Sequence, residues 1–331
     1  MAQLLIATSE SDTHADAVIK ELSSSTIEPV RVNTESIIQQ AQYHYAWDAV
    51  GNLYDHALTF QDSLREAKDV KVIWWRKPQV YRHHPEVEDE WAIKYSQEET
   101  KSLIFSLPGL YPNAKWVNYY YNLRLPSQRI NQIPIAKQLG IPIPPTLVTN
   151  NYESALNFLK QYGGCIIKPM SYSGFLHDDR QYACYTRPID AETLDTFQES
   201  IHLAPVFLQK RISKKAEYRV TLIGNQSFVC RIEAEHLADS DIALDWRVTE
   251  PEKLTHVPDT LPDSYIAKLR QMLEIFGLHF GAFDIICDND DTLYFIELNP
   301  NGQWYWIEIL TGMPMAKAMV TLIEELARVE G

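Results

Sequence analysis

The stretch GAFDIICDNDDTLYFIELNPNG, residues 281–302, is the most informative part of the chain, because its acidic residues lie within two apolar segments. Its apolar segments Ala282–Cys287 and Leu293–Leu298 flank the polar run 288–291, which is the pattern of a β-hairpin. The Pro- and Gly-containing exit at 299–302 is typical of the rim of a site rather than of a plain turn. The stretch therefore predicts a hairpin that carries polar chemistry.

Three oxygen-bearing side chains share one face of this predicted hairpin. If the turn is symmetric over residues 288–291, Asp284 faces Phe295, and Glu297 lies diagonal to Asp284 at about 7–8 Å. Asn299 shares the face because side chains alternate along a strand. Two carboxylates and an amide oxygen are the hard donors that Mg²⁺ prefers. We therefore predict a magnesium site at Asp284, Glu297 and Asn299.

The residues between these polar positions fit a buried opposite face. Phe283, Ile285, Ile296 and Leu298 are apolar, so we expect them to anchor the hairpin in the core. The alternative is that the two carboxylates are solvated on an exposed sheet face, and the alternation alone leaves this open.

A second candidate group surrounds Lys168, which ends the apolar run 165–167. A lysine in this position sends its ammonium either to solvent or to an anion such as phosphate. The loop that follows offers the hydroxyls of Ser171 and Ser173 and the permissive backbone of Gly174, which could cover a triphosphate. The alternative is an ordinary strand-end lysine in water.

Arg219 and Arg231 are expected on the two strands of another hairpin, which turns at 224–225. Cations on the same face beside a metal site would stabilise the charge that develops on a transferring phosphoryl group. The alternative is that these arginines bridge to Glu217 or Glu233 at the rim, and the spacing favours neither interpretation.

Apolar strands alternate with helices along the chain, which predicts an α/β (α+β) fold in three parts. We place an open α/β domain at residues 1–115, a central domain at 116–205 and a C-terminal domain at 206–331. In the last part, helices are expected from near Asp263 to Gly277 and at 316–328.

Composition excludes several classes of partner for this chain of 331 residues. The formal net charge of −14 repels nucleic acid phosphates and anionic lipids, so neither is expected to bind. No stretch approaches the roughly 20 apolar residues of a membrane span, and the N-terminus lacks the pattern of a signal peptide. Cys165, Cys230 and Cys287 lie in apolar segments, so we expect buried thiols and a cytoplasmic protein.

These residues, in this order, resemble the ATP-grasp superfamily, and more closely the maturases of graspetides, the omega-ester peptides that include microviridin. The resemblance spans nearly the whole chain and is most specific in its last four motifs. The motifs are Trp74-Trp75-Arg76-Lys77-Pro78, Trp116-Val117-Asn118, Ala136-x-x-Leu139-Gly140-Ile141-x-Ile143-Pro144-x-Thr146, Lys168-Pro169, Glu217-x-Arg219-Val220, Asp245-Trp246-Arg247, Gly281-Ala282-Phe283-Asp284 and Glu297-Leu298-Asn299-Pro300-Asn301-Gly302-Gln303-Trp304.

The resemblance implies an ATP-grasp fold with an N-terminal pre-ATP-grasp lobe, a central lobe and a C-terminal lobe that binds nucleotide and metal. It implies that Asp284, Glu297 and Asn299 hold two Mg²⁺ ions that bridge the phosphates of ATP. The residues implied to bind the nucleotide are Arg129, Lys168, Ser173, Gln209, Lys210, Arg211, Ile212 and Glu217. Among them, Lys168 would grip phosphate, and the segment Gln209–Ile212 would line the adenine through its backbone.

Two of these positions depart from the family pattern. Arg129 stands where relatives usually carry a nucleotide-contacting lysine, and Lys210 stands where many carry a glutamate. The resemblance also implies catalytic roles for two arginines. Arg219 would steady the transferring γ-phosphoryl group, and Arg247 would hold the substrate carboxylate or its acyl phosphate.

The implied activity is ATP-dependent ligation on a ribosomal precursor peptide, whose leader would bind the central region. An Asp or Glu side chain would become an acyl phosphate, and Ser, Thr or Lys of the same peptide would close a macrocyclic ester or amide. A homodimer is implied as well. The first alternative is an ATP-grasp ligase that joins an amino acid to a small molecule or a protein tail. The second is a nucleotide-binding regulatory protein without turnover.

Overall fold

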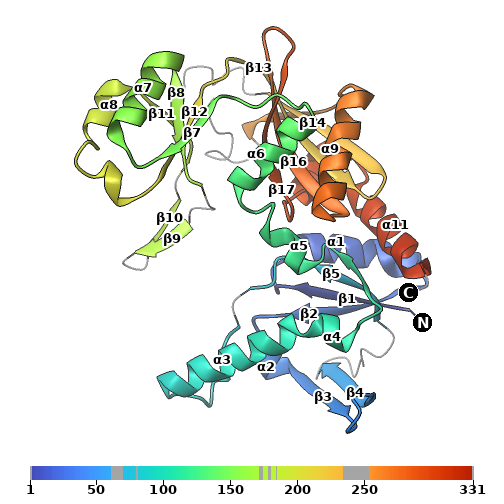
Figure 1. The fold of residues 1–331 in the computed structure, drawn as a ribbon. Helices are drawn as coiled ribbons and strands as arrows, with labels where there is room; N and C mark the ends of the chain where they lie inside the picture. Colours follow the sequence, from blue (N-terminus) through green and yellow to red (C-terminus); the bar gives the residue numbers. More distant parts are fainter. Residues whose placement is uncertain are drawn as a thin grey trace. The chain divides into compact units, whose positions relative to one another are not determined.

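The computed structural model describes residues 2–60, 70–79, 81–170, 174–177, 180–183, 185–233 and 253–329. The chain forms two compact units, whose elements are labelled in Figure 1. Unit 1 comprises Met1–Tyr120, Ile223–Gln226 and Pro314–Gly331, and unit 2 comprises Tyr121–Leu222 and Ser227–Met313. Among the described residues, no helix is both long enough and apolar enough to span a membrane.

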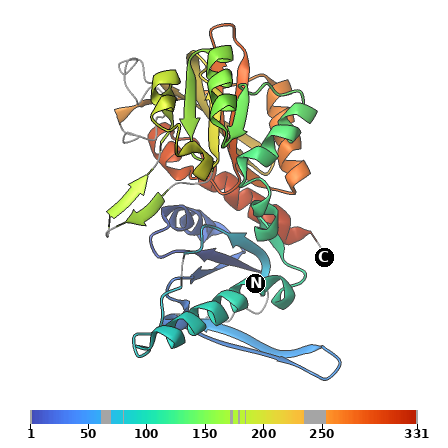
Figure 2. The same cartoon turned by 60° about the vertical axis from the view of Figure 1, so that its left-hand side comes forward.

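Unit 1 is built on a parallel four-stranded sheet in the order β2-β1-β5-β6. Its strands are β1 (Gln3–Thr8), β2 (Glu28–Asn33), β5 (Val70–Trp75) and β6 (Lys115–Val117). Helices α1 (Thr13–Glu21) and α11 (Met315–Arg328) pack together on one face, and α3 (Glu90–Phe105) and α4 (Leu107–Leu110) cover the other (Figures 1 and 2). Because both faces are covered, β1 is buried at every position.

The remaining described elements of unit 1 lie outside this four-stranded sheet. They are the 3₁₀ turn Leu22–Ser24, α2 (Ile37–Gln40) and the hairpin of β3 (Ala41–Trp47) with β4 (Leu53–Phe60). The final helix predicted at 316–328 is confirmed by α11. It belongs to unit 1, whereas the sequence prediction grouped it with residues 206–331.

A buried polar cluster lies at the carboxyl ends of β1 and β5. Asp12 caps α1, accepts a hydrogen bond from the Thr8 hydroxyl at 2.5 Å, and lies 3.1 Å from Nδ1 of His14 and 3.5 Å from Nε of Arg76. Burial raises the pKa of Asp12, but the contacts with His14, Arg76 and Thr8 outweigh it and lower that pKa to about 2. The cluster therefore holds a carboxylate inside unit 1.

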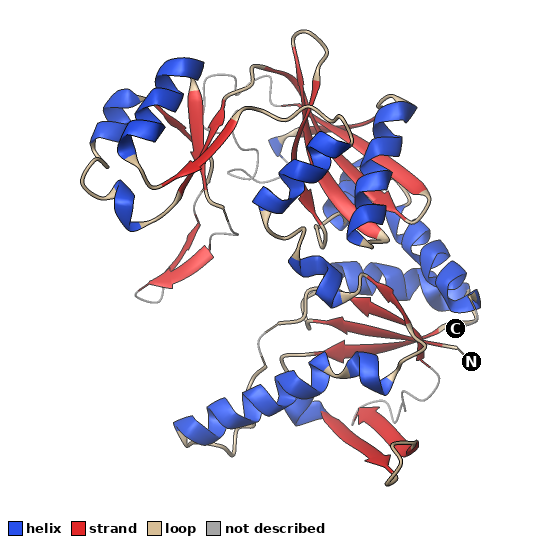
Figure 3. Ribbon diagram, in the orientation of Figure 1, coloured by secondary structure: helices blue, strands red, loops and turns tan. Residues whose placement is uncertain are grey.

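Unit 2 contains a four-stranded sheet in the order β11-β8-β12-β7, whose neighbouring strands are antiparallel. Its strands are β7 (Thr146–Thr149), β8 (Cys165–Lys168), β11 (Arg187–Ile189) and β12 (Val206–Lys210). Helices α7 (Tyr152–Tyr162) and α8 (Ala191–Asp195) and the 3₁₀ turn Ile201–Leu203 pack on this sheet through an apolar cluster (Figures 1 and 3). A separate hairpin joins β9 (Gly174–His177) to β10 (Arg180–Ala183).

The second sheet of unit 2 has five strands in the order β15-β14-β13-β16-β17. They are β13 (Lys214–Ile223), β14 (Gln226–Glu233), β15 (Thr255–Asp259), β16 (Phe280–Asp288) and β17 (Leu293–Asn299). One large apolar cluster joins this sheet to α6 (Arg129–Gln138) and α9 (Asp263–Phe276) (Figure 1). The short helices α5 (Tyr120–Arg124) and α10 (Tyr305–Thr311) complete the chain.

Several local predictions are confirmed in unit 2. Helix α9 ends at Gly277, whose left-handed conformation, with φ +65°, is one that glycine adopts without strain. The predicted thiols Cys165, Cys230 and Cys287 are buried and unpaired with one another. Strand β12 pairs with β7 and β8, so the first sheet extends past the boundary predicted after residue 205. The division into three domains stays a prediction.

Candidate functional site

The hairpin of β16 and β17 is confirmed, but its register differs from the predicted one. Asp284 pairs directly with Glu297, whereas Phe295 pairs with Ile285, so the prediction that Asp284 faces Phe295 is wrong. The register shifts by one residue between Asp284 and Ile285, and Ile296 is the extra residue of a β-bulge. The bulge therefore brings the two carboxylates opposite each other.

The bulge also corrects the position predicted for Ile296. Phe283, Ile285 and Leu298 lie in the apolar core, as predicted. Ile296 instead lines a cavity together with its neighbour Glu297, because a bulge interrupts the alternation of side chains along the strand. The sequence pattern carries no mark of this interruption.

Each of the two carboxylates binds one arginine. Arg219 Nη1 donates to Asp284 Oδ1 at 2.6 Å, and Arg129 donates to Glu297 Oε2 through Nε at 2.6 Å and contacts it through Nη2 at 2.5 Å. Asp284 is 6% exposed and Glu297 is 8% exposed. The interpretation as two solvated carboxylates on an open sheet face is therefore wrong.

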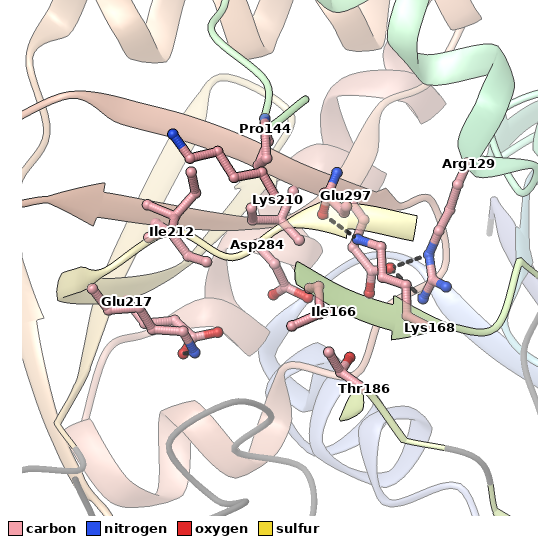
Figure 4. Close-up of a pocket in the computed structure, with 14 residues that line it drawn as sticks. Arg129, Pro144, Ile166, Lys168, Thr186, Lys210, Ile212, Glu217, Asp284 and Glu297 are labelled. Carbon is pink, nitrogen blue, oxygen red and sulfur yellow. Dashed lines mark hydrogen bonds and ion pairs between the residues drawn. The ribbon is translucent and has the colours of Figure 1, made fainter. Parts of the chain in front are cut away.

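A cavity of about 560 Å³ of empty space, part of it open solvent, lies in front of these carboxylates (Figure 4). Most of the predicted site residues line it, namely Arg129, Lys168, Gln209, Lys210, Ile212, Glu217, Asp284 and Glu297. The other lining residues are Pro144, Ile166, Thr186, Lys214, Ile286 and Ile296.

The charge of the cavity wall differs from that of the whole chain. Four basic side chains (Arg129, Lys168, Lys210 and Lys214) and three carboxylates (Glu217, Asp284 and Glu297) line it. The formal net charge of the chain is −14. The wall therefore carries one more positive than negative side chain, so an anionic ligand meets less repulsion here than over the chain as a whole.

Lys168 is buried at the end of β8 and does not extend into bulk water. Its Nζ donates to Oε1 of Gln209 at 2.9 Å and lies 5.1 Å from the centre of the Phe207 ring. The side chain is 7% exposed. The interpretation of Lys168 as an ordinary solvated lysine is therefore wrong. A buried ammonium on a cavity wall is suited to bind an anion such as phosphate.

The segment Gln209–Ile212 borders the cavity where β12 ends. The Gln209 side chain donates to the Thr146 hydroxyl at 2.9 Å, which fixes it between β7 and β8. The backbone amides of Lys210 and Arg211 donate to Pro145 O at 2.9 Å and Gly164 O at 3.0 Å. Among the described residues, the Ile212 amide makes no backbone hydrogen bond, so it is the amide of this segment that suits a nucleobase acceptor.

Glu217 lies at the opposite end of the lined space from Arg129 (Figure 4). It accepts a hydrogen bond from Lys214 Nζ at 2.6 Å. Arg231, which the sequence placed beside Arg219, instead contacts Glu233 at 2.7 Å and Asp259 at 3.1 Å. The rim interpretation is therefore correct for Arg231, whereas Arg219 is bound to Asp284.

Three described residues of the predicted site are not on the cavity lining, namely Arg211, Arg219 and Asn299. Asn299 follows Glu297 on β17, and its Oδ1 accepts a hydrogen bond from the Asn301 amide at 3.1 Å. Gly302 separates Asn299 from Arg219, because a Cβ built there would lie 2.8 Å from Arg219 Nη2 and 3.4 Å from Asn299 Cβ. Ser173 and Arg247 lie outside the described residues.

Sequence reasoning missed several lining residues, and the reason differs between them. Ile286 and Ile166 lie two residues from Asp284 and Lys168 on the same strands, so strand alternation could have identified them. Ile296 reaches the cavity only because of the bulge. No sequence pattern around Thr186 indicated that it would line the cavity.

The donors at this site fit a divalent cation. Two mostly buried carboxylates that face each other repel unless cations neutralise them, which the two arginines do here. Within the described residues, no group of three or more His, Cys, Asp or Glu side chains is arranged for a metal. The third protein donor would be the Asn299 amide oxygen, which keeps one lone pair beside its bond to Asn301.

The architecture can be compared with solved structures. A RiPP-associated ATP-grasp ligase of Chryseobacterium gregarium, in complex with ADP and a leader and core peptide, is 23% identical. The match has a TM-score of 0.87 and covers 98% of this chain and 97% of that one. This chain has the ATP-grasp fold. No protein-family model matches it, and no curated protein is significantly similar to it.

Two further solved structures share this fold. The macrocyclase MdnC of Microcystis aeruginosa, bound with the precursor peptide MdnA, is 22% identical, with a TM-score of 0.83 and 98% and 100% of the two chains covered. The ATP-grasp ligase PsnB, complexed with a minimal precursor, Mg and ADP, is 18% identical, with a TM-score of 0.74 and 98% and 97% covered. All three matches include both units of this chain.

Proposed function

We propose that this protein is an ATP-dependent carboxylate ligase that forms macrocyclic ester or amide bonds in a ribosomal precursor peptide. One observation carries the proposal. Asp284 and Glu297 face each other in the wall of a cavity that Lys168 and Arg129 also line. The fold is that of ligases whose structures hold ADP and precursor peptides.

The cavity offers a separate place for each part of ATP. Lys168 and Arg129 would bind the phosphates at one end, because their positive charges lie beside the carboxylates there. The backbone of Gln209–Ile212 would line the adenine. Glu217, at the other end of the cavity, would accept a hydrogen bond from the nucleoside. Ser173 would cover the phosphates.

Asp284, Glu297 and Asn299 would hold two Mg²⁺ ions. Bound magnesium neutralises phosphate oxygens and so favours nucleophilic attack on the γ-phosphorus. Arg219 would fix the Asp284 carboxylate through the contact described above and add positive charge near the transferring phosphoryl group. Arg247 would hold the substrate carboxylate.

The reaction would proceed in two steps. A carboxylate oxygen of Asp or Glu attacks the γ-phosphorus of ATP, ADP leaves, and an acyl phosphate forms. A Ser or Thr hydroxyl, or a Lys amine, of the same peptide then attacks the acyl carbon and loses its proton, and phosphate leaves. Closure of the enzyme over the site would keep out the water that could hydrolyse the acyl phosphate.

The proposal also includes the precursor peptide as the binding partner and a homodimer as the oligomeric state. An acidic core peptide would be repelled by the −14 surface, so its reacting carboxylate would need a local positive charge, which Arg247 would supply. The leader segment of the peptide would bind the central region, and the enzyme would act as a homodimer.

Mass spectrometry tests this function directly. The protein is incubated with ATP, Mg²⁺ and candidate precursor peptides rich in Thr, Ser, Asp and Glu, and each ring closed should remove the mass of one water. Asp284→Asn and Glu297→Gln should each slow this loss about 100-fold or more, because metal contacts supply several kcal/mol in the transition state.

The matched control is Asp290→Asn, an exposed carboxylate in the turn of the same hairpin, which should react as the wild type does. If no candidate peptide loses water while ATP still binds, the macrocyclase proposal is wrong. If Asp284→Asn and Glu297→Gln react at the wild-type rate, the proposed metal site is wrong.

A further inference from the structure

Within the part of the chain that the structure describes, β17 is the last strand of its sheet and pairs only with β16. The outer backbone groups of an edge strand lack a ladder partner and must find one elsewhere. At Leu298, which is 3% exposed, bulk water cannot serve as that partner. The position matters because Leu298 lies between the proposed metal ligands Glu297 and Asn299.

Gln132 on α6 supplies both missing hydrogen bonds. Its Oε1 accepts from the Leu298 amide at 2.8 Å, and its Nε2 donates to the Leu298 carbonyl at 2.8 Å. Nε2 also donates to the Pro126 carbonyl at 2.6 Å, and Gln132 is 2% exposed. The side-chain amide therefore acts as a one-residue substitute for a neighbouring strand.

The same helix contacts the metal-ligand segment a second time. Arg129 precedes Gln132 by three residues, so the two side chains lie on one face of α6. Arg129 binds the Glu297 carboxylate, and Gln132 binds the backbone of the next residue. The face of α6 that lies toward β17 therefore holds both the Glu297 side chain and the Leu298 backbone.

We propose that Gln132 is a positioning residue for the metal site, which holds the backbone between Glu297 and Asn299 so that both donors face the same cations. This inference rests on the proposed function. Loss of the amide would leave a buried N–H and a buried C=O of Leu298 without a partner, which is costly. The strand end would rotate or bend toward water, and the two donors would diverge.

The test measures divalent-metal affinity apart from turnover. Mn²⁺, followed by electron paramagnetic resonance, is titrated into the full chain with the non-hydrolysable analogue AMP-PNP. Gln132→Met keeps the side-chain length but has no hydrogen-bonding group. It should weaken Mn²⁺ binding roughly 10- to 100-fold, the usual effect of removing a residue that orients metal ligands.

Two further variants separate positioning from folding. Gln132→Asn keeps the amide but is one methylene too short to reach Leu298, so it should also weaken Mn²⁺ binding even if it folds better than Gln132→Met. Gln138→Met changes an exposed glutamine of the same helix and should bind Mn²⁺ as the wild type does. Thermal unfolding without metal reports the fraction of each variant that is folded.

The outcomes are distinct. If folded Gln132→Met or Gln132→Asn binds Mn²⁺ with wild-type affinity, Gln132 only stabilises the fold and the inference is wrong. If wild-type protein binds no Mn²⁺ with AMP-PNP, the proposed function itself fails, and the inference fails with it. Weak binding in both Gln132 variants, with wild-type binding in Gln138→Met, supports the positioning role.

Discussion

Arg129 contacts the Glu297 carboxylate through two nitrogens, Nε at 2.6 Å and Nη2 at 2.5 Å. Its third nitrogen, Nη1, donates to the carbonyl of Pro169, which is the residue that follows Lys168. One guanidinium therefore joins the start of α6, the end of β8 and a proposed metal ligand on β17. A cation in the first turn of a helix is unfavourable for the helix dipole, so the contact with Glu297 compensates for that cost.

This contact predicts that Arg129 competes with a metal ion for Glu297. In Arg129→Gln the Glu297 carboxylate loses the positive charge of Arg129. Mn²⁺ should therefore bind the nucleotide-free protein more tightly by about fivefold, which corresponds to ~1 kcal/mol for a partly screened ion pair. Metal titration without nucleotide measures the effect. Arg124→Gln makes the same change of charge at an exposed position and should have no effect. Equal or weaker Mn²⁺ binding in Arg129→Gln would rule out competition.

A second prediction concerns the buried pair of Arg219 and Asp284. In Arg219→Met the buried carboxylate loses the cation of Arg219, so the free energy of unfolding should fall by about 3–5 kcal/mol. Mg²⁺ should restore part of this loss, because it would supply the missing charge, and should stabilise the variant more than the wild type. Urea unfolding with and without Mg²⁺ measures both effects.

The control for this pair is Lys215→Met on the same strand. Lys215 and its partner Asp291 are exposed, so the loss of stability should be small beside that of Arg219→Met. A metal-free Arg219→Met protein as stable as the wild type would contradict the prediction.

Gly302 is predicted to tolerate no side chain. A Cβ there would lie 2.7 Å from Ala282 Cβ and 2.8 Å from Arg219 Nη2, so Gly302→Ala should lower the free energy of unfolding by about 1–3 kcal/mol. Peptide modification should also slow, because Arg219 must move away from Asp284. Gly109→Ala, in α4 with no atom within 4 Å of the added Cβ, should be neutral or slightly stabilising. Chemical unfolding of both variants provides the comparison.

The polar cluster of unit 1 predicts loss of stability in mild acid. Burial is the largest influence on His14 and, although the Asp12 contact opposes it, lowers the pKa of His14 from 6.5 to about 4. Between these two values the unfolded chain binds a proton that the folded chain does not. The free energy of unfolding should therefore fall on the order of 3 kcal/mol as the pH drops from about 6.5 to about 4.

Urea unfolding at a series of pH values measures this slope. His14→Gln cannot take up the proton and should show a flatter profile between pH 6.5 and pH 4. Equal slopes in the two proteins would mean that other groups cause the acid sensitivity. Above about pH 7, His14 is neutral in both states and should contribute no slope.

Local periodicity explains what could be predicted from the sequence. The alternation of apolar and polar residues from Ala282 to Leu298 predicted the hairpin and placed Asp284 and Glu297 on one face, because side-chain direction along a strand repeats every second residue. The 3.6-residue repeat and Gly277 likewise predicted α9 and its end. These signals depend only on residues close in the chain.

Other features depend on partners far away in the chain. The bulge at Ile296 arises from the pairing of two strands, and it turned a diagonal relationship of Asp284 and Glu297 into a direct one. Lys168 is buried against Gln209, 41 residues later, which no pattern around Lys168 indicates. The buried environment of Lys168 could therefore be seen only in the folded sheet.

Local sequence patterns indicated which chemical groups this protein offers and on which strands they lie: two carboxylates and an amide on one hairpin, and a lysine at the end of another strand. Folding in three dimensions brings Arg129 to Glu297 and Gln132 to Leu298, across separations of 168 and 166 residues. Contacts between residues so far apart in the chain depend on the packing of α6 against β17, because local sequence does not indicate which distant segment a side chain will contact.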